Sequence, residues 1–243
     1  MRRLCLLLAL LPALAPAADV LRNAPRTGIY IESDYLAADA NCDWYFPAAT
    51  VVEMAPPAGD ADCPVVIRIR GVLNREGARL FERVTEALGD WPAVPTRIVL
   101  NSRGGDSQAA LYMAGIIRAH ALFRRRKPGV MTTIDESEAA VCFSACVILF
   151  AAGFERHALF DEYDDPALPS RLGIHSPAQY DRRQMEYDTS IANRNILVVR
   201  RQLEAYFDSV GVSRELVDAM FAVPFEDLRL LTEAEARGYG LVP

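Results

Sequence analysis

The sequence predicts an α/β fold, and three observations carry this prediction. Runs of apolar, β-branched residues alternate with helical patterns through the middle of the chain. Helix-capping residues stand where the helices are expected to begin. The 243 residues, 51% of them hydrophobic, are enough for one sizeable core. Alternating strands and helices form right-handed crossover units, so we expect an α/β core.

The predicted elements follow one another from about residue 63 to the end of the chain. Strands are predicted at residues 65–70, 97–101, 130–134 and 172–175. Helices are predicted after the capping residues Asn74 and Asp106, from Ser144, from about 181 to 210, after Ser213 and after Thr232. Thr232 and Glu235 form a capping-box pattern. For residues 19–62 the sequence predicts only short strands and a loop.

The N-terminus has the pattern of an export signal. Two arginines precede an apolar run from Leu4 to Leu14, and small residues follow up to Ala17, the expected cleavage point. The run is shorter than the roughly 20 apolar residues of a spanning helix, with an uncleaved anchor as the alternative. We therefore expect a signal peptide at 1–17, an N-terminal extension at 18–62 and one domain at 63–243. The mature protein is expected to be periplasmic or secreted, without a membrane span.

The charge balance argues against a nucleic-acid partner. The chain carries a formal net charge of −6, which disfavours binding to phosphates. Its one basic cluster, residues 124–127, follows a predicted helix. Cations at that end offset the negative pole of the helix dipole, so a capping role is the simpler interpretation. We expect no cofactor.

Four of the five cysteines remain after signal cleavage, which suggests two disulfides in an oxidising compartment. Cys42 and Cys63 would tie down the N-terminal segment. Cys142 and Cys146 would brace the turn around Ser144, provided that Cys142 is extended, because an i,i+4 pair within a regular helix suits a disulfide poorly. Buried free thiols are the alternative. We do not expect these cysteines to bind a metal, because no histidine lies near them in the sequence.

Three segments point together to acyl transfer. Gly104 and Gly105 lie where a strand leads into a helix, so a backbone N–H there can face a ligand, as an oxyanion hole requires. Ser144 opens an apolar helix, and the amide of Ala145 is the matching donor. His175 ends a strand before a Ser-Pro step and is placed to act as a base. Each signal is weak alone, and the combination carries the hypothesis.

These motifs and their order resemble the Clp protease proteolytic subunit. A Gly-Gly pair after a strand is followed by the serine with Leu-Phe-Ala-Ala-Gly at 149–153, and then by Ile-His-Ser-Pro at 174–177. The closing segment, 231–242, is similar too, and the resemblance covers roughly residues 64–243. It implies the Clp/crotonase spiral of ββα units in a single domain. It also implies a serine peptidase that acts on peptides or proteins through a Ser-His-Asp triad.

Carried over from that family, Ser144 is the nucleophile and His175 the general base. Ala145 with Gly104 or Gly105 supplies the oxyanion hole.

The acid of the triad is expected just before the closing segment. Asp227 lies there, one position from the family pattern, and Asp218 is the alternative. Arg103 stands where the family usually has proline, and cysteines replace small residues around the serine. An ATP-driven partner is not expected outside the cytoplasm. The long helix at 181–210 corresponds to the part that mediates ring contacts in the family, which makes a homo-oligomer a further expectation.

Three other interpretations compete. A Ser-Lys dyad is disfavoured because Lys127, the only lysine, sits in an exposed basic turn that cannot lower its pKa. A catalytically inactive relative would use the same core as a binding or assembly module. An acyl-CoA enzyme of crotonase type would stabilise oxyanions in the same way, but neither the serine-histidine pair nor the expected location suits it.

Overall fold

The computed structural model describes residues 28–33, 45–47, 63–89, 93–136, 140–158, 169–177 and 189–243. The predicted signal peptide and Cys42 lie outside these residues.

Nine strands and seven helical segments occur in the described residues. The strands are β1 (Gly28–Ser33), β2 (Tyr45–Pro47), β3 (Cys63–Arg70), β4 (Ala93–Asn101), β5 (Met131–Ile134), β6 (Cys142–Phe143), β7 (Glu155–His157), β8 (Pro169–Ile174) and β9 (Arg229–Thr232). The helices are α2 (Arg75–Gly89), α3 (Ser107–Ala119), the 3-10 helix η2 (Ala121–Arg124), α4 (Ala145–Ala151), α5 (Thr189–Ser209), α6 (Glu215–Phe221) and α7 (Glu233–Gly238).

The strands form two sheets, and the α/β class is confirmed. The larger sheet has the order β2-β1-β3-β4-β5-β7, and its strands β3, β4, β5 and β7 are parallel. The smaller sheet has the order β6-β8-β9, with β6 parallel and β9 antiparallel to β8. The strands β1 and β2 belong to the segment predicted as an extension, yet β1 pairs with β3 over six residues. The sheet of the predicted domain therefore continues into that segment.

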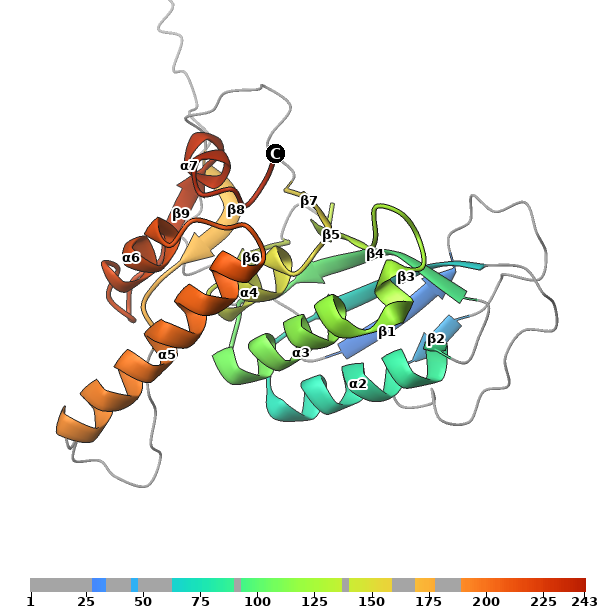
Figure 1. The fold of residues 1–243 in the computed structure, drawn as a ribbon, viewed down its shortest axis with the longest axis horizontal. Coiled ribbons are helices and arrows are strands. Elements are labelled where there is room, and N and C mark those ends of the chain that lie inside the picture. The colour runs from blue at the N-terminus through green and yellow to red at the C-terminus, as the bar shows by residue number, and fades with distance from the viewer. Residues whose placement is uncertain are drawn as a thin grey trace, which may run out of the picture.

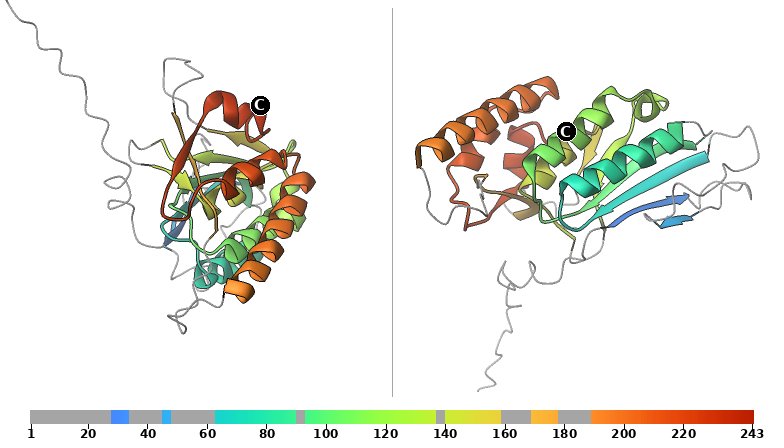
Figure 2. Two further views of the ribbon diagram at one scale, coloured as in Figure 1. Left: turned by 90° about the vertical axis from the view of Figure 1, so that its left-hand side faces the viewer. Right: turned by 90° about the horizontal axis from the view of Figure 1, so that it is seen from below.

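The helices α2 and α3 lie side by side against the larger sheet (Figure 1). Ile67 and Ile69 of β3 are buried, as are Phe81 of α2 and Met113 of α3. Phe81 also stacks on Phe123 with ring centroids 5.8 Å apart. The smaller sheet, α6 and α7 gather at the opposite end of the molecule from β1 and β2 (Figures 1 and 2). The core thus extends from the large sheet to the small one.

The apolar helix predicted from Ser144 is α4, and all seven of its residues are buried. Its last carbonyl groups need partners away from water. The Tyr206 hydroxyl donates to Ile148 O (2.8 Å), Thr132 Oγ1 donates to Phe150 O (2.6 Å), and Arg156 Nη1 donates to Ala151 O (3.3 Å). Side chains from β5, β7 and α5 therefore close the end of the helix.

The predicted helix starts are confirmed by their caps. Asn74 Oδ1 accepts from the Gly77 N–H at 2.7 Å, and Asp106 Oδ1 accepts from the Gln108 N–H at 2.8 Å. The capping box of α7 is complete. The long helix α5 begins at Thr189, whereas the predicted start at 181 lies outside the described residues. The short strands β6, β7 and β9 were not predicted.

The basic cluster at 124–127 serves in part as a cap, as the sequence suggested. Arg124 donates to Ala119 O at the end of α3 (2.8 Å), and Arg125 donates to Gly89 O at the end of α2 (2.6 Å). Lys127 is exposed. Across the described segments, no helix combines the length and apolar character needed to cross a membrane.

Candidate active site

Ser144 lies in the turn between β6 and α4 and has a strained backbone. Its φ of 56° and ψ of −122° make it the only non-glycine residue with positive φ in the described part of the chain. Such a conformation persists only where the surroundings hold it, and it typically marks a functional position. A strained strand-to-helix turn also presents a serine hydroxyl to a substrate. The backbone N–H of Ser144 donates to Gly173 O at 2.8 Å, which fixes the turn to β8.

A disulfide spans this turn. Cys142 on β6 and Cys146 on α4 are joined with an S–S distance of 2.05 Å. The predicted condition is met, since Cys142 is extended and only Cys146 is helical. The predicted bridge between Cys42 and Cys63 involves Cys42, which lies outside the described residues. No cluster of metal-binding side chains occurs within the described ranges.

His175 follows the end of β8, beside the strand that leads to Ser144. The parallel register pairs Phe143 with Gly173, so the serine and the histidine both lie just beyond the carboxyl ends of adjacent strands. Ligands of α/β proteins bind at such strand ends. The imidazole is half-buried, and its Nδ1 lies 2.8 Å from Ser176 O. The ring of Phe225 meets it edge-on, with centroids 5.2 Å apart.

Gly104 brings the glycine loop against the serine turn. A Cβ at this position would lie 2.7 Å from Ser144 Cβ, 2.5 Å from Phe143 O and 2.8 Å from Ala145 N. Its φ is 92°, which also favours glycine. Gly105 has a φ of 138°, and a Cβ there would meet Leu73 O at 2.2 Å. Only glycines allow the loop to pack this closely on the serine turn and on Leu73.

The hydrogen bonds of the loop separate the roles of the two glycines. The N–H of Gly104 donates to Ser102 Oγ at 3.0 Å, and the buried Ser102 hydroxyl donates in turn to Gly71 O. The N–H groups of Gly105 and Ala145 are without a protein acceptor in the described residues, and Gly104 provides the close approach to the serine turn. Ser102 was not singled out from the sequence, because a buried serine has no signature of its own.

The carboxylates proposed from the sequence stand apart from the histidine. Asp227 is exposed, and its backbone N–H donates to Pro224 O at 3.1 Å. The Asp218 carboxylate pairs with Arg200 of α5. No hydrogen bond or ion pair links either aspartate to His175 in the described structure. Ser144 and His175 thus follow adjacent strand ends and Gly104 packs on the serine turn, whereas neither aspartate is paired with the histidine in the described residues.

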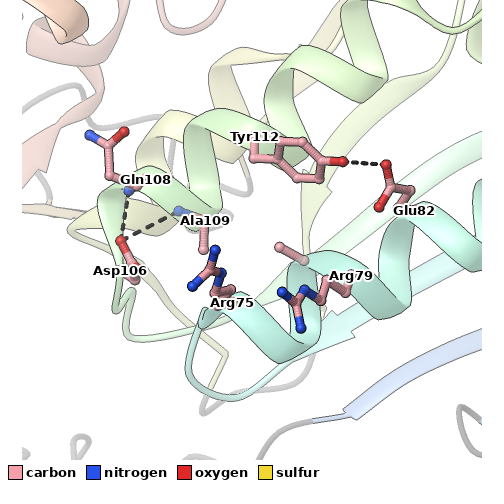
Figure 3. A pocket seen from close by; sticks show the side chains of 8 residues that line it. Arg75, Arg79, Glu82, Asp106, Gln108, Ala109 and Tyr112 are labelled. Carbon is pink, nitrogen blue, oxygen red and sulfur yellow. Dashed lines mark hydrogen bonds between the residues drawn. The ribbon is translucent and has the colours of Figure 1, made fainter.

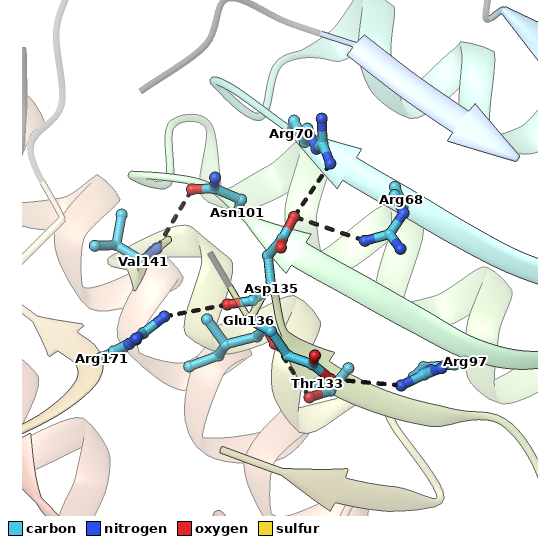
Figure 4. Close-up of polar contacts among 10 residues, drawn as sticks. Arg68, Arg70, Arg97, Asn101, Thr133, Asp135, Glu136, Val141 and Arg171 are labelled. Carbon is cyan, nitrogen blue, oxygen red and sulfur yellow. Dashed lines mark hydrogen bonds and ion pairs between the residues drawn. The ribbon is translucent and has the colours of Figure 1, made fainter. Parts of the chain in front are cut away.

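A buried aspartate elsewhere links β3 to β8. Asp135 follows β5, is 8% exposed and pairs with Arg70 (3.3 Å) and Arg68 (3.7 Å) of β3 (Figure 4). Its backbone carbonyl accepts from Arg171 Nη1 of β8 at 3.2 Å. Nearby, Asn101 Oδ1 accepts from the Val141 N–H at 3.3 Å, just before β6. These contacts join the large sheet to the strands that carry the site.

A separate pocket of about 490 Å³ opens between α2 and α3 (Figure 3). It is lined by Arg75, Ala78, Arg79, Glu82, Asp106, Gln108, Ala109 and Tyr112. The Tyr112 hydroxyl donates to Glu82, and this hydrogen bond is the main cause that raises the pKa of the tyrosine. Neither Ser144 nor His175 lines this pocket. Asp106, which lines the pocket, directly follows Gly105 in the sequence.

The strands and helices define an α/β protein with a serine and a histidine at adjacent strand ends. Among solved structures, the chain is similar to the N165D mutant of ClpP1 from Listeria monocytogenes, with 19% sequence identity and a TM-score of 0.45. The match covers 73% of this chain and 88% of the other. No family model and no curated protein matches the sequence.

Proposed function

We propose that the protein is a serine hydrolase, a peptidase of Clp type, with Ser144 as nucleophile and His175 as general base. The observation that carries this proposal is the strained backbone of Ser144, held beside the end of β8 and packed against Gly104. A non-glycine residue in this conformation is costly, and it is expected where the strain serves a function. The resemblance noted in the sequence adds peptides or proteins as the substrate class.

The chemistry follows from the roles of these groups. The Nδ1 of His175 is engaged by Ser176 O, which leaves Nε2 to take the proton of the Ser144 hydroxyl as Oγ attacks the carbonyl carbon. The N–H groups of Gly105 and Ala145 stabilise the oxyanion. The imidazolium then returns its proton to the leaving amine as the C–N bond breaks. Water, deprotonated by the same nitrogen, hydrolyses the acyl-enzyme and regenerates the serine.

Export to the periplasm or outside the cell is part of the proposal. The signal-like N-terminus supports it, and so does the disulfide at Cys142 and Cys146, because disulfides persist in oxidising compartments. A homo-oligomer is proposed as well. Leu197 and Val198 of α5 are more than half exposed, at 55% and 53%, and would be covered in an assembly.

A fluorophosphonate probe tests the proposed activity. The mature protein is expected to be labelled at Ser144, and Ser144→Ala and His175→Ala are expected to abolish labelling. Lys127→Ala is the matched control and is expected to label as the wild type does, because Lys127 is exposed in the basic turn. A folded wild-type protein that resists the probe would reject the hydrolase and favour an inactive binding or assembly module.

A further inference from the structure

We infer that the backbone carbonyl of Ser176, and not a carboxylate, is the positioning group for His175. This inference rests on the proposed function, and it replaces the aspartate of the predicted triad by a neutral acceptor. It rests on the contact between Nδ1 and Ser176 O at 2.8 Å and on the exposed or paired state of the described carboxylates nearby.

The contact determines which ring nitrogen carries the proton. A carbonyl oxygen only accepts hydrogen bonds, so Nδ1 must be the donor and carry the hydrogen. The neutral imidazole then has its lone pair on Nε2, the nitrogen that a general base uses. In serine proteases the buried aspartate selects this same tautomer. The carbonyl of Ser176 therefore performs the orienting part of that role.

The carbonyl is itself held in place. The N–H of Ser176 donates to Val223 O at 2.9 Å, in the turn that leads towards β9. Pro177 follows and restricts the backbone of Ser176 to extended conformations. The ring of Phe225 packs against the imidazole from the same turn. Ser176 is thus held by its N–H on one side and restricted by Pro177 on the other, so its carbonyl can orient a histidine as a side chain would.

The residue that continues the strand register opposite His175 is apolar. The antiparallel register pairs Gly173 with Leu230 and Ile174 with Arg229. One step further along, Leu228 stands level with the histidine. Its Cδ1 lies 3.0 Å from where a Cβ of Gly173 would be, so this side chain packs on β8.

Among the residues that the structure describes, the carboxylates of this region are exposed or already paired. Glu226 and Asp227 are exposed in the turn before β9. Asp218 pairs with Arg200, and Asp135 pairs with Arg68 and Arg70.

The first measurement is the tautomer of His175 by nitrogen-15 NMR of the mature protein labelled at its histidine rings. The chain has only three histidines, so the spectrum of His175→Ala assigns the signals. We expect a protonated Nδ1 and an unprotonated Nε2 in the wild type, in Asp227→Asn and in Asp218→Asn. If Asp227 were the orienting group, the asparagine variant would lose this tautomer, as the equivalent change does in serine proteases.

The second measurement is the rate of acylation by the fluorophosphonate. Replacing the aspartate of a true triad by asparagine costs about 10⁴-fold in kcat, whereas we expect changes within about twofold for Asp227→Asn, Asp218→Asn and the double variant. Glu226→Gln is the matched control, because it neutralises another exposed carboxylate of the same turn. It is expected to retain both the rate and the tautomer.

The outcomes separate this inference from the proposed function. A loss of about 10³-fold or more in folded Asp227→Asn or Asp218→Asn overturns the inference and makes that aspartate the acid. A wild type with the opposite tautomer overturns it as well. If the wild type is not acylated, the proposed function fails, whatever the tautomer.

Discussion

Gly104 is the residue on which the approach of the glycine loop to Ser144 depends. Gly104→Ala would place a methyl group within 2.8 Å of backbone atoms of Phe143 and Ala145, which cannot move aside as a flexible side chain does. We expect acylation to fall by at least about 10²-fold, the usual cost of disturbing an oxyanion hole. The measurement is the rate of labelling by the fluorophosphonate.

Gly115→Ala is the control for that variant. Gly115 lies within α3, and an added Cβ would meet no atom within 4 Å. We expect unchanged labelling and a gain of about 0.5–1 kcal/mol in the free energy of unfolding, because alanine favours helix. Equal labelling rates for the two alanine variants would contradict the role given to Gly104.

The buried phenol of Tyr206 connects α5 to the end of α4, and its neutral form stabilises the folded protein. Burial raises the pKa of this phenol above its ordinary value of 10.0, because the charged form is desolvated in the folded protein. The contribution of the neutral phenol to the free energy of unfolding is therefore fully present below pH 10. It is lost as the pH rises from there through the pKa of the folded state. Tyr206→Phe should cost about 1–2 kcal/mol at neutral pH, since Ile148 O loses its donor.

Denaturant unfolding between neutral pH and pH 11 checks this expectation. The wild type should lose stability above pH 10 more steeply than Tyr206→Phe. Tyr112→Phe, which removes an exposed phenol, is the control and should follow the wild type at neutral pH. Parallel curves for the wild type and Tyr206→Phe would show that this phenol is not linked to unfolding.

At the scale of elements, the disulfide ties the strand before Ser144 to the helix after it. Replacing both Cys142 and Cys146 by alanine removes the tie while the surrounding helix remains buried. We expect slower acylation, because the strained turn can relax towards an ordinary backbone conformation. Far-UV circular dichroism should be unchanged. An acylation rate equal to that of the wild type would show that β8 alone maintains the turn.

The elements that the sequence revealed are those with strong local signals. The caps at Asn74, Asp106 and Thr232 predicted the starts of α2, α3 and α7, and the apolar run after Ser144 predicted α4. The strands β6 and β7 have two and three residues, too few for a periodic pattern. The pairing of β9 with β8 joins residues more than 50 positions apart, and a single sequence gives no sign of such contacts.

The candidate site was predictable to a similar extent. Serine, histidine and glycines stand in segments with recognisable turns, so each could be proposed from its neighbours. The N–H of Gly104, but not that of Gly105, is bonded to the hydroxyl of Ser102, which a sequence does not reveal. The contact of His175 with Ser176 O depends on the path of the backbone. Both are consequences of tertiary structure. Asp227 stays a prediction of the sequence, and the asparagine variant tests it.

At the scale of the whole molecule, the site lies between two sheets that carry different parts of it. Ser144 and His175 follow β6 and β8 of the small sheet, whereas Gly105 follows β4 of the large sheet. An isolated bridge joins the sheets, with Ser102 N–H donating to Val141 O (2.7 Å) and Phe143 N–H donating to Ser102 O (2.9 Å).

This bridge makes the alignment of the site a property of how the two sheets sit on each other. A small sliding of the small sheet would carry the proposed nucleophile and base along together, and the amide of Ala145 with them. The same sliding would move them away from the amide of Gly105, which follows the large sheet. The proposed oxyanion hole would then lose one of its two donors, and the hydrogen bonds of Ser102 to Val141 and Phe143 keep the two sheets aligned against this.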